Sequence, residues 1–311
     1  MTEEYIAHYS VLKQECLHYL SEKVPATFSE ATFLDLTFGA GGHSFGLLER
    51  SANTKVIAFD QDSDAYENGL KQIAEKKVGD RIQLIRANFQ SIDQHPIYQE
   101  HEGKIAGILL DLGVSTHHFF HSERGFSFKG EAAELDMRMD QDNEELLTAK
   151  EIVNGYSEKG LIEMFENLGE EKFAKRIARK IIESRDPSPI NTTKELEHLV
   201  FHAYPPNLRH GKTHPATRVF QALRIEVNQE LEVLTQVLEK LPKLLRQDGR
   251  LLVISFHSLE DRIVKHFFKQ FCQVNENYQI LTKKPIIPSP QEISENNRSR
   301  SAKLRILERK K

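Results

Sequence analysis

The sequence predicts an α/β protein built on a parallel sheet, with an all-helical region inserted between its fourth and fifth strands. First, a strand, a glycine turn and a helix follow one another at residues 32–50. Second, apolar strand-like runs alternate with helical patterns as far as residue 112, which favours a parallel sheet. Third, about a hundred residues with mainly helical patterns precede the next apolar strand, at 250–256. A chain of 311 residues is long enough for two units of this kind.

The first strand and its turn, TFLDLTFGAGGHS at 32–44, organise the rest of the chain. A glycine turn between a strand and a helix presents backbone N–H groups and a positive helix end to a ligand. The third glycine of the dinucleotide fingerprint would fall on Ser44, which disfavours an NAD-linked oxidoreductase. The GxGG turn suits an S-adenosylmethionine pocket better, although an ordinary tight turn is the equally simple interpretation at this point.

Two further strands end in acidic residues. The second strand, 55–60, ends in Asp60, about 20 residues past the glycines, where such folds place an acid that binds ribose hydroxyls. The alternative for Asp60 is a helix N-cap, a role equally open to Asp62 or Ser63. The fourth strand, 105–112, is almost entirely apolar but contains Asp111 near its end, and a carboxylate there needs polar partners.

The third strand, 81–87, runs into Phe89. This ring is predicted either to stack on an adenine or to pack in the core.

The inserted region contains helical patterns at 148–154, 159–167 and 173–182. The last has an apolar stripe and an opposite basic side, and residues 171–185 hold six basic and two acidic residues. A basic amphipathic helix is either a solvated face or a phosphate contact.

A single long helix is expected at 218–241, with Thr217, Gln221, Arg224 and Asn228 forming a polar stripe beside its apolar one. Solvated helix faces prefer Lys and Glu, so this stripe indicates a site. Ser258, with Asp261 three residues on, is expected to cap the helix after the fifth strand. The basic segment 298–311 is a second candidate phosphate contact, and the alternative, above all for its last three residues, is a solvated C-terminus.

Bulk composition excludes several classes of protein. A net charge of −4 argues against general affinity for polyanions, so a nucleic-acid surface must be a local patch. No apolar run is long enough to span a bilayer, and two cysteines far apart fit the reducing cytosol, so a cytoplasmic protein without membrane contact is expected. The histidines at 117, 118 and 121 match no common metal spacing, and no metal is predicted.

Several runs together resemble the bacterial ribosomal RNA small-subunit methyltransferase H family, also called MraW. They include FGAGGHS (38–44), GILLDLGVS (107–115), LDMRMD (135–140), FAKRIARKI (173–181) and HPATRVFQALRIEVNQEL (214–231). The resemblance covers nearly the whole chain. It implies a class I S-adenosylmethionine-dependent methyltransferase (Rossmann-like) sheet, at 1–114 and 216–311, with an inserted helical substrate-recognition domain at 115–215.

The resemblance also implies a function: transfer of a methyl group from S-adenosylmethionine to the N4 amine of a cytidine in the decoding region of small-subunit (16S) ribosomal RNA. The partner would be that RNA within the small ribosomal subunit; no oligomeric state is predicted. The alternatives are a methyltransferase with another acceptor and a non-catalytic RNA-binding factor, and an intact GAGGH loop with Asp60 and Asp111 favours an enzyme.

Matching residue by residue, the expected cofactor contacts are Gly41, Gly42, His43, Asp60, Phe89, Asp111 and His118. His118 stands where the family usually has a glutamine. Asp111 is expected where cofactor and cytosine meet, because a carboxylate suits the N4–H₂ donor. The candidates for the base pocket are Arg138, His214, Arg218, Gln221, Arg224, Asn228 and His257.

Overall fold

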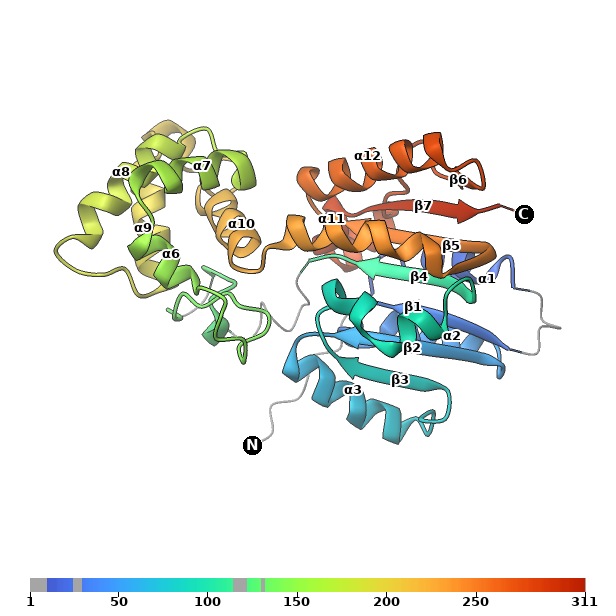
Figure 1. Ribbon diagram of the computed structural model, residues 1–311. Coiled ribbons are helices and arrows are strands. Elements are labelled where there is room, and N and C mark those ends of the chain that lie inside the picture. The colour runs from blue at the N-terminus through green and yellow to red at the C-terminus, as the bar shows by residue number, and fades with distance from the viewer. Residues whose placement is uncertain (1–9, 25–29, 114–121, 130–131, 311) are drawn as a thin grey trace. The chain divides into compact units, whose positions relative to one another are not determined.

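The computed structural model describes residues 10–24, 30–113, 122–129 and 132–310. The chain forms two compact units (Figure 1). The first, called here the sheet unit, comprises Met1–Ser115 and Leu231–Lys311. The second, the helical unit, comprises Thr116–Glu230. Among the described helices, none is both long and apolar enough to cross a membrane.

The sheet unit is built on seven strands in the order β3-β2-β1-β4-β5-β7-β6. Their bounds are β1 Ala31–Asp35, β2 Thr54–Asp60, β3 Ile82–Arg86, β4 Ile105–Asp111, β5 Leu245–Ser255, β6 Tyr278–Ile280 and β7 Lys303–Arg309. Strands β1 to β5 pair in parallel, and β7 runs antiparallel between β5 and β6. The carboxyl ends of β2, β1 and β4 therefore meet at one edge of the sheet.

Helices cover both faces of the sheet (Figure 1). In the sheet unit they are α1 Lys13–Ser21, α2 Gly42–Arg50, α3 Ser63–Glu75, α4 Pro96–Glu100, α11 Glu230–Lys240, α12 Ser258–Val274 and α13 Pro290–Glu295, with 3-10 turns η1 Phe89–Gln94, η4 Leu241–Leu244 and η5 Asn297–Ser301. Successive strand residues point to opposite faces. Phe33 accordingly packs in a core cluster that includes α1 and α2, and Leu34 in a second one that includes α11 and α12.

The helical unit consists of α6 Ala149–Gly155, α7 Glu158–Gly169, α8 Ala174–Arg185, α9 Thr193–Ala203 and α10 Ala216–Val227, with 3-10 turns η2 Ser122–Arg124 and η3 Pro206–Leu208. Thr148 and Thr192 begin α6 and α9 with capping boxes. Helices α7 and α10 approach closely, since a Cβ at Gly169 would lie 2.7 Å from the Arg218 carbonyl oxygen. This packing holds α10 in the helical unit.

The prediction of a single helix at 218–241 is wrong, because the structure has two helices, α10 and α11. The break is at Asn228, which ends α10, and Gln229, which has φ +50°. The Asn228 amide donates to the Met137 carbonyl and its oxygen accepts from the Met139 N–H, both at 2.8 Å, so this residue is held by a neighbouring segment. The boundary between the units falls at 230/231, whereas the sequence interpretation placed it at 215/216.

Half of the basic C-terminal segment, Lys303–Arg309, lies within the sheet as strand β7. Lys303 and Arg305 both pair with Asp261 on α12, at 3.1 and 2.6 Å, and Arg309 donates to the Leu245 carbonyl. Burial raises the pKa of Asp261, but the bonds from Arg305 and Lys303 outweigh that effect and hold this pKa below its usual range. These three basic groups therefore have internal partners.

Candidate active site

The turn after β1 is held from inside by Asp35. Its Oδ2 accepts from the Ser44 hydroxyl at 2.6 Å and its Oδ1 from the Thr37 N–H at 3.2 Å. Burial raises the pKa of this carboxyl to about 6, against the lowering effect of both bonds. Asp35 therefore joins the two ends of the glycine loop, and its side chain is 1% exposed, so it is part of the framework.

The three glycines of the loop are required for different physical reasons. At Gly41, which has φ +75°, a Cβ would lie 2.5 Å from the Phe45 ring, and at Gly42 it would lie 1.9 Å from the Ser10 hydroxyl. Those two positions are glycine because the protein itself crowds them. At Gly39, which has φ +53°, a Cβ would meet no described atom within 4 Å. Gly39 therefore borders open space beside the site.

Asp60 lies at the end of β2 against this open space. Its Oδ2 accepts from the Gly39 N–H at 2.7 Å, and its Oδ1 from the Asp62 N–H at 2.9 Å. Burial raises the pKa of Asp60 to about 7 despite these two bonds. The helix cap is Asp62, whose side chain accepts from the Asp64 and Ala65 N–H groups. Each Asp60 carboxylate oxygen thus retains a second lone pair that can accept a hydrogen bond from a ligand.

Asp111 ends β4, in the strand next to β1. Its N–H donates to the Thr37 hydroxyl at 2.7 Å. Its Oδ2 lies 3.8 Å from the His43 Nδ1, and its Oδ1 is buried with no hydrogen-bond partner among the described residues. Burial raises the pKa of this carboxyl well above its usual value, with further contributions from Asp35 and Glu260. A buried acceptor without a donor is the strongest sign of a ligand in this unit.

His43, at the start of α2, is the fourth member of the site. Its side chain is buried, and its Nε2 lies 3.1 Å from the Val11 carbonyl oxygen. A carbonyl only accepts, so Nε2 carries the proton and Nδ1 is the nitrogen that faces Asp111. Thr37 and Val11 were not singled out from the sequence, because neither belongs to a recognisable pattern.

The remaining expected cofactor contacts are Phe89 and His118. Phe89 is the first residue of η1 and packs, partly buried, against the core cluster that contains Leu34. Phe89 is only partly buried, so the core and stacking interpretations are compatible. His118 lies outside the described residues.

His257 follows β5 and is the N-cap residue of α12, in place of the expected Ser258. The Glu260 carboxylate accepts from the Phe256 and His257 N–H groups at 2.7 and 3.3 Å, which closes the first turn. The His257 Nε2 lies 3.1 Å from the Glu260 Oε1, an electrostatic contact outside hydrogen-bond geometry. The cap residue differs from the prediction because Glu260, at the third helical position, accepts from the backbone N–H groups at the start of the helix.

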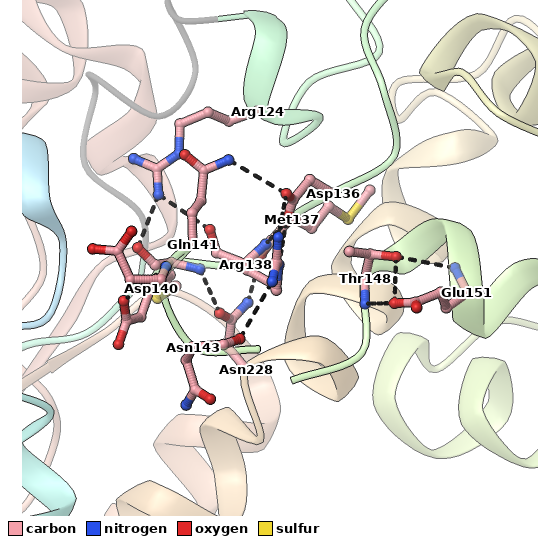
Figure 2. A network of polar contacts seen from close by, with 12 residues as sticks. Arg124, Asp136, Met137, Arg138, Asp140, Gln141, Asn143, Thr148, Glu151 and Asn228 are labelled. Atoms are coloured by element: carbon pink, nitrogen blue, oxygen red, sulfur yellow. Dashed lines mark hydrogen bonds and ion pairs between the residues drawn. The ribbon is translucent and has the colours of Figure 1, made fainter. Parts of the chain in front are cut away.

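In the helical unit, two of the base-pocket candidates, Arg138 and Asn228, organise the LDMRMD segment (Figure 2). Arg138 forms a bidentate pair with Asp136, at 2.9 and 3.0 Å, which holds the pKa of that carboxyl below its usual range despite desolvation. Asn228 binds the backbone on both sides of Arg138. Arg224 forms a second bidentate pair, with Glu230, at 2.7 and 2.9 Å. Two residues of the polar stripe, Arg224 and Asn228, therefore have partners inside the protein.

The other three candidates also have partners within the helical unit. The His214 ring stacks on Phe128, with centroids 4.8 Å apart, and its Nε2 lies 3.2 Å from Glu197. Arg218 donates to the Glu170 carbonyl at 3.0 Å, and Gln221 to the Leu168 carbonyl at 3.2 Å. These contacts join α10 to the end of α7.

Helix α8 has the two faces expected from the sequence. Ala174, Ile177, Ala178 and Ile181 are buried. The exposed residues Lys172, Lys175, Arg176, Arg179 and Lys180 are called here the α8 basic face. Arg185 does not belong to it, because its guanidinium donates to the Val153 and Tyr156 carbonyls inside the unit.

In the sheet unit, carboxylates end three adjacent parallel strands, and a glycine turn opens on space beside two of them. Asp60 can accept from ribose hydroxyls, and the unpartnered Asp111 oxygen can accept from an ammonium group, which are the donors of S-adenosylmethionine. This fold and site define a class I S-adenosylmethionine-dependent methyltransferase. The chain belongs to the MraW methylase family, whose model matches residues 5–310.

Its relatives match over their full lengths. The chain is 48% identical over 302 residues to the ribosomal RNA small subunit methyltransferase H of Sulfurihydrogenibium sp. (strain YO3AOP1), covering 97% of this chain and 98% of that protein. It is 46% identical over 303 residues to the protein of that name from Picosynechococcus sp. (strain ATCC 27264 / PCC 7002 / PR-6), covering 97% of each. It is 42% identical over 323 residues to that of Oenococcus oeni (strain ATCC BAA-331 / PSU-1), covering 99% of this chain and 100% of that protein.

Proposed function

We propose that this chain methylates the N4 amine of a cytidine in the decoding region of small-subunit ribosomal RNA. Membership of the MraW methylase family supports methyl transfer, and the names of the relatives support ribosomal RNA as the acceptor. The observation that carries the chemistry is the buried Asp111 Oδ1, which has no donor among the described residues at the carboxyl end of β4. Such an oxygen needs a positively polarised N–H to face it.

The cofactor is S-adenosylmethionine, which when bound supplies a methyl group on a sulfonium, an electrophile that needs little further activation. In the proposed arrangement Gly39, which borders open space, lets the cofactor approach the backbone, and Asp60 accepts from its ribose hydroxyls. Asp111 accepts from its ammonium group, from the cytosine, or from both in turn. Phe89 offers the accessible part of its ring to the adenine.

The acceptor is the more demanding partner, because the N4 lone pair of cytosine is delocalised into the ring. A carboxylate that accepts from N4–H₂ localises that lone pair and stabilises the positive charge that develops on the amine. Asp111 is the group proposed for this role. The target base must be unpaired or flipped out, since its amine is not accessible inside a helix.

The helical unit is proposed to bind the RNA. The α8 basic face presents five exposed cationic side chains, four of them on α8 and the fifth, Lys172, just ahead of it. The phosphate backbone is recognised by such faces, which position the RNA without reading its sequence. Arg138 and Asn228 are proposed to act by holding the LDMRMD segment in shape. The remaining candidates stay proposed contacts of the base: Arg224, His214, Arg218, Gln221 and His257. A ribosomal partner implies that the enzyme acts in the cytoplasm.

The proposal is tested by incubating the purified chain with small ribosomal subunits and S-adenosylmethionine labelled in its methyl group. After extraction, we expect label in the RNA fraction and none in the ribosomal proteins. Label in the protein fraction, or in neither fraction while the cofactor binds, would support a different acceptor. Naked ribosomal RNA in a parallel reaction shows whether the assembled subunit is required.

A further inference from the structure

The segment Ser10–Leu12, ahead of α1, lies directly against the glycine loop. The Ser10 hydroxyl fills the space where Gly42 lacks a side chain, and the Val11 carbonyl accepts from His43 at 3.1 Å. Ser10, Val11 and Leu12 are all buried, at 8%, 3% and 0% exposure. This segment therefore forms one wall of the candidate site, although nothing in its sequence marks it as functional.

Leu12 has an unusual backbone conformation. Its φ of 52° and ψ of 33° are left-handed, which is sterically unfavourable for a leucine. Such a conformation persists only where the surroundings enforce it. Leu12 is also the N-cap residue of α1, and its side chain cannot cap the helix. An external contact must therefore hold this residue in place.

That contact comes from Glu292, 280 positions further along the chain. Its Oε1 accepts from the Leu12 N–H at 2.7 Å, in a buried hydrogen bond. Glu292 lies on the short helix α13, is 7% exposed, and donates its own N–H to Ser289, the N-cap of that helix. The carboxylate is thus placed by its own helix and directed at a single backbone group.

The Leu12 N–H and the Val11 carbonyl belong to the same peptide group. That group is planar, so fixing its N–H also fixes the direction of its C=O. The contacts run without interruption from Glu292 to the Val11–Leu12 peptide, from its carbonyl to the His43 Nε2, and from the His43 Nδ1 towards Asp111 at 3.8 Å. The first two of these contacts are hydrogen bonds that share one peptide group, so they polarise one another.

We propose that Glu292 is a positioning residue of the cofactor site: by orienting the Val11–Leu12 peptide it holds His43 as the Nε2–H form, with Nδ1 towards the Asp111 carboxylate. This inference rests on the proposed function, which places Asp111 at the cofactor. Glu292 does not touch the cofactor itself. The role requires an acceptor oxygen at this point and not a charge, so glutamine should replace it and alanine should not.

The test compares Glu292→Ala and Glu292→Gln, with Glu295→Gln as the control, since Glu295 lies exposed on the same helix. Affinity for S-adenosylmethionine is measured by calorimetry, kcat and KM by methyl transfer, and the His43 ring nitrogens by ¹⁵N NMR without cofactor. We expect alanine to weaken cofactor affinity about tenfold, as for loss of a buried acceptor, with a smaller effect on kcat. Glutamine should stay within about twofold of the wild type.

The NMR measurement separates positioning from simple stability. We expect the His43 Nε2–H form in the wild type and the glutamine variant, and a mixture of forms in the alanine variant. Unchanged affinity and unchanged His43 resonances in a folded alanine variant, even one with a lower Tm, would overturn the proposal. If that variant does not fold, Glu292→Asp carries the same prediction, because its shorter side chain withdraws the oxygen from Leu12.

Failure of the proposed function would have a different signature. A wild-type chain that binds the cofactor but leaves cytidine unmodified would refute the acceptor, while the affinity and NMR comparisons between the Glu292 variants would still decide the positioning role.

Discussion

Replacing Asp111 by asparagine should have opposite effects on stability and on cofactor binding. The exchange keeps the shape of the side chain and removes its charge. No backbone N–H in the described residues donates to this carboxylate, and its Oδ1 is buried without a partner. The substitution therefore breaks no hydrogen bond within the described residues, because the Asp111 contact to Thr37 uses the backbone N–H.

The expected magnitudes follow from this environment. A hydrogen bond to a charged group contributes about 1.5–3 kcal/mol, so loss of the carboxylate should raise the Kd for S-adenosylmethionine roughly tenfold to hundredfold. An amide costs less to bury than a carboxylate, so the free protein should become more stable, on the order of 1 kcal/mol.

The pH dependence of that stability gain has a definite sign. Burial raises the pKa of Asp111 in the folded protein. The wild-type carboxyl therefore contributes stability when the pH is below its ordinary, unfolded-state pKa, and this stability is lost as the pH rises through the raised, folded-state pKa. The advantage of the asparagine variant should therefore be small in acid and full at alkaline pH.

Stability is measured by urea unfolding without cofactor at several pH values, and affinity by calorimetry. Asp80→Asn is the matched control, because this aspartate is exposed and should change neither quantity. An asparagine variant that keeps wild-type affinity and full methyl transfer would refute the assignment of Asp111. A variant that is destabilised at alkaline pH would refute the account of its burial.

Three further predictions concern the loop, the ribose and the RNA. Gly42→Ala should lose cofactor binding because its Cβ would lie 1.9 Å from Ser10, and thermal unfolding will show whether the loop has shifted. Gly41→Ala should also lose cofactor binding. Gly155→Ala, a surface control, should retain it. Affinity for S-adenosylmethionine should rise with pH up to about 7, with proton release on binding below that pH, because the ionised form of Asp60 is the better acceptor. Calorimetry in two buffers of different ionisation enthalpy measures the proton release. The Asp60→Asn substitution should abolish this pH dependence. Replacing three residues of the α8 basic face, Arg176, Arg179 and Lys180, by glutamine should weaken RNA binding and flatten its salt dependence, whereas an unchanged slope in filter-binding assays would remove this face from the RNA surface.

The parallel strands were predictable because their pattern is local. Strands buried on both faces read as apolar runs, and β2 and β4 end at the acids that the sequence singled out, Asp60 and Asp111. The helices α6, α7 and α8 were expected for the same reason, since their apolar stripes repeat at helical spacing.

The sequence interpretation failed where a distant contact decides the structure. Apolar residues repeat without interruption through Asn228, so one helix was expected, yet the backbone of the LDMRMD segment binds this side chain and the helix ends there. The basic residues of β7 resembled a tail because their partner, Asp261, is 40 or more positions away. A contact such as Leu12 with Glu292, across 280 positions, leaves no local pattern at all.

Part of the candidate site was therefore predictable and part was not. Gly41, Gly42, Asp60 and Asp111 stand at strand ends and turns, where chemistry and position agree. The polar stripe on α10 suggested ligand contacts, whereas Arg224 and Asn228 have internal partners in the structure. A stripe of amide and guanidinium groups is a sign of polar partners, and from sequence alone the partner can be a substrate or another part of the protein.

The most direct test of the central claim is to identify the methylated nucleoside. RNA from small ribosomal subunits treated with the purified chain and labelled S-adenosylmethionine would be digested to nucleosides and separated by chromatography with mass detection. The account predicts that the label elutes as N4-methylcytidine and that the Asp111→Asn variant gives much less of it. Label on another nucleoside, or on a different atom of cytidine, would contradict the account.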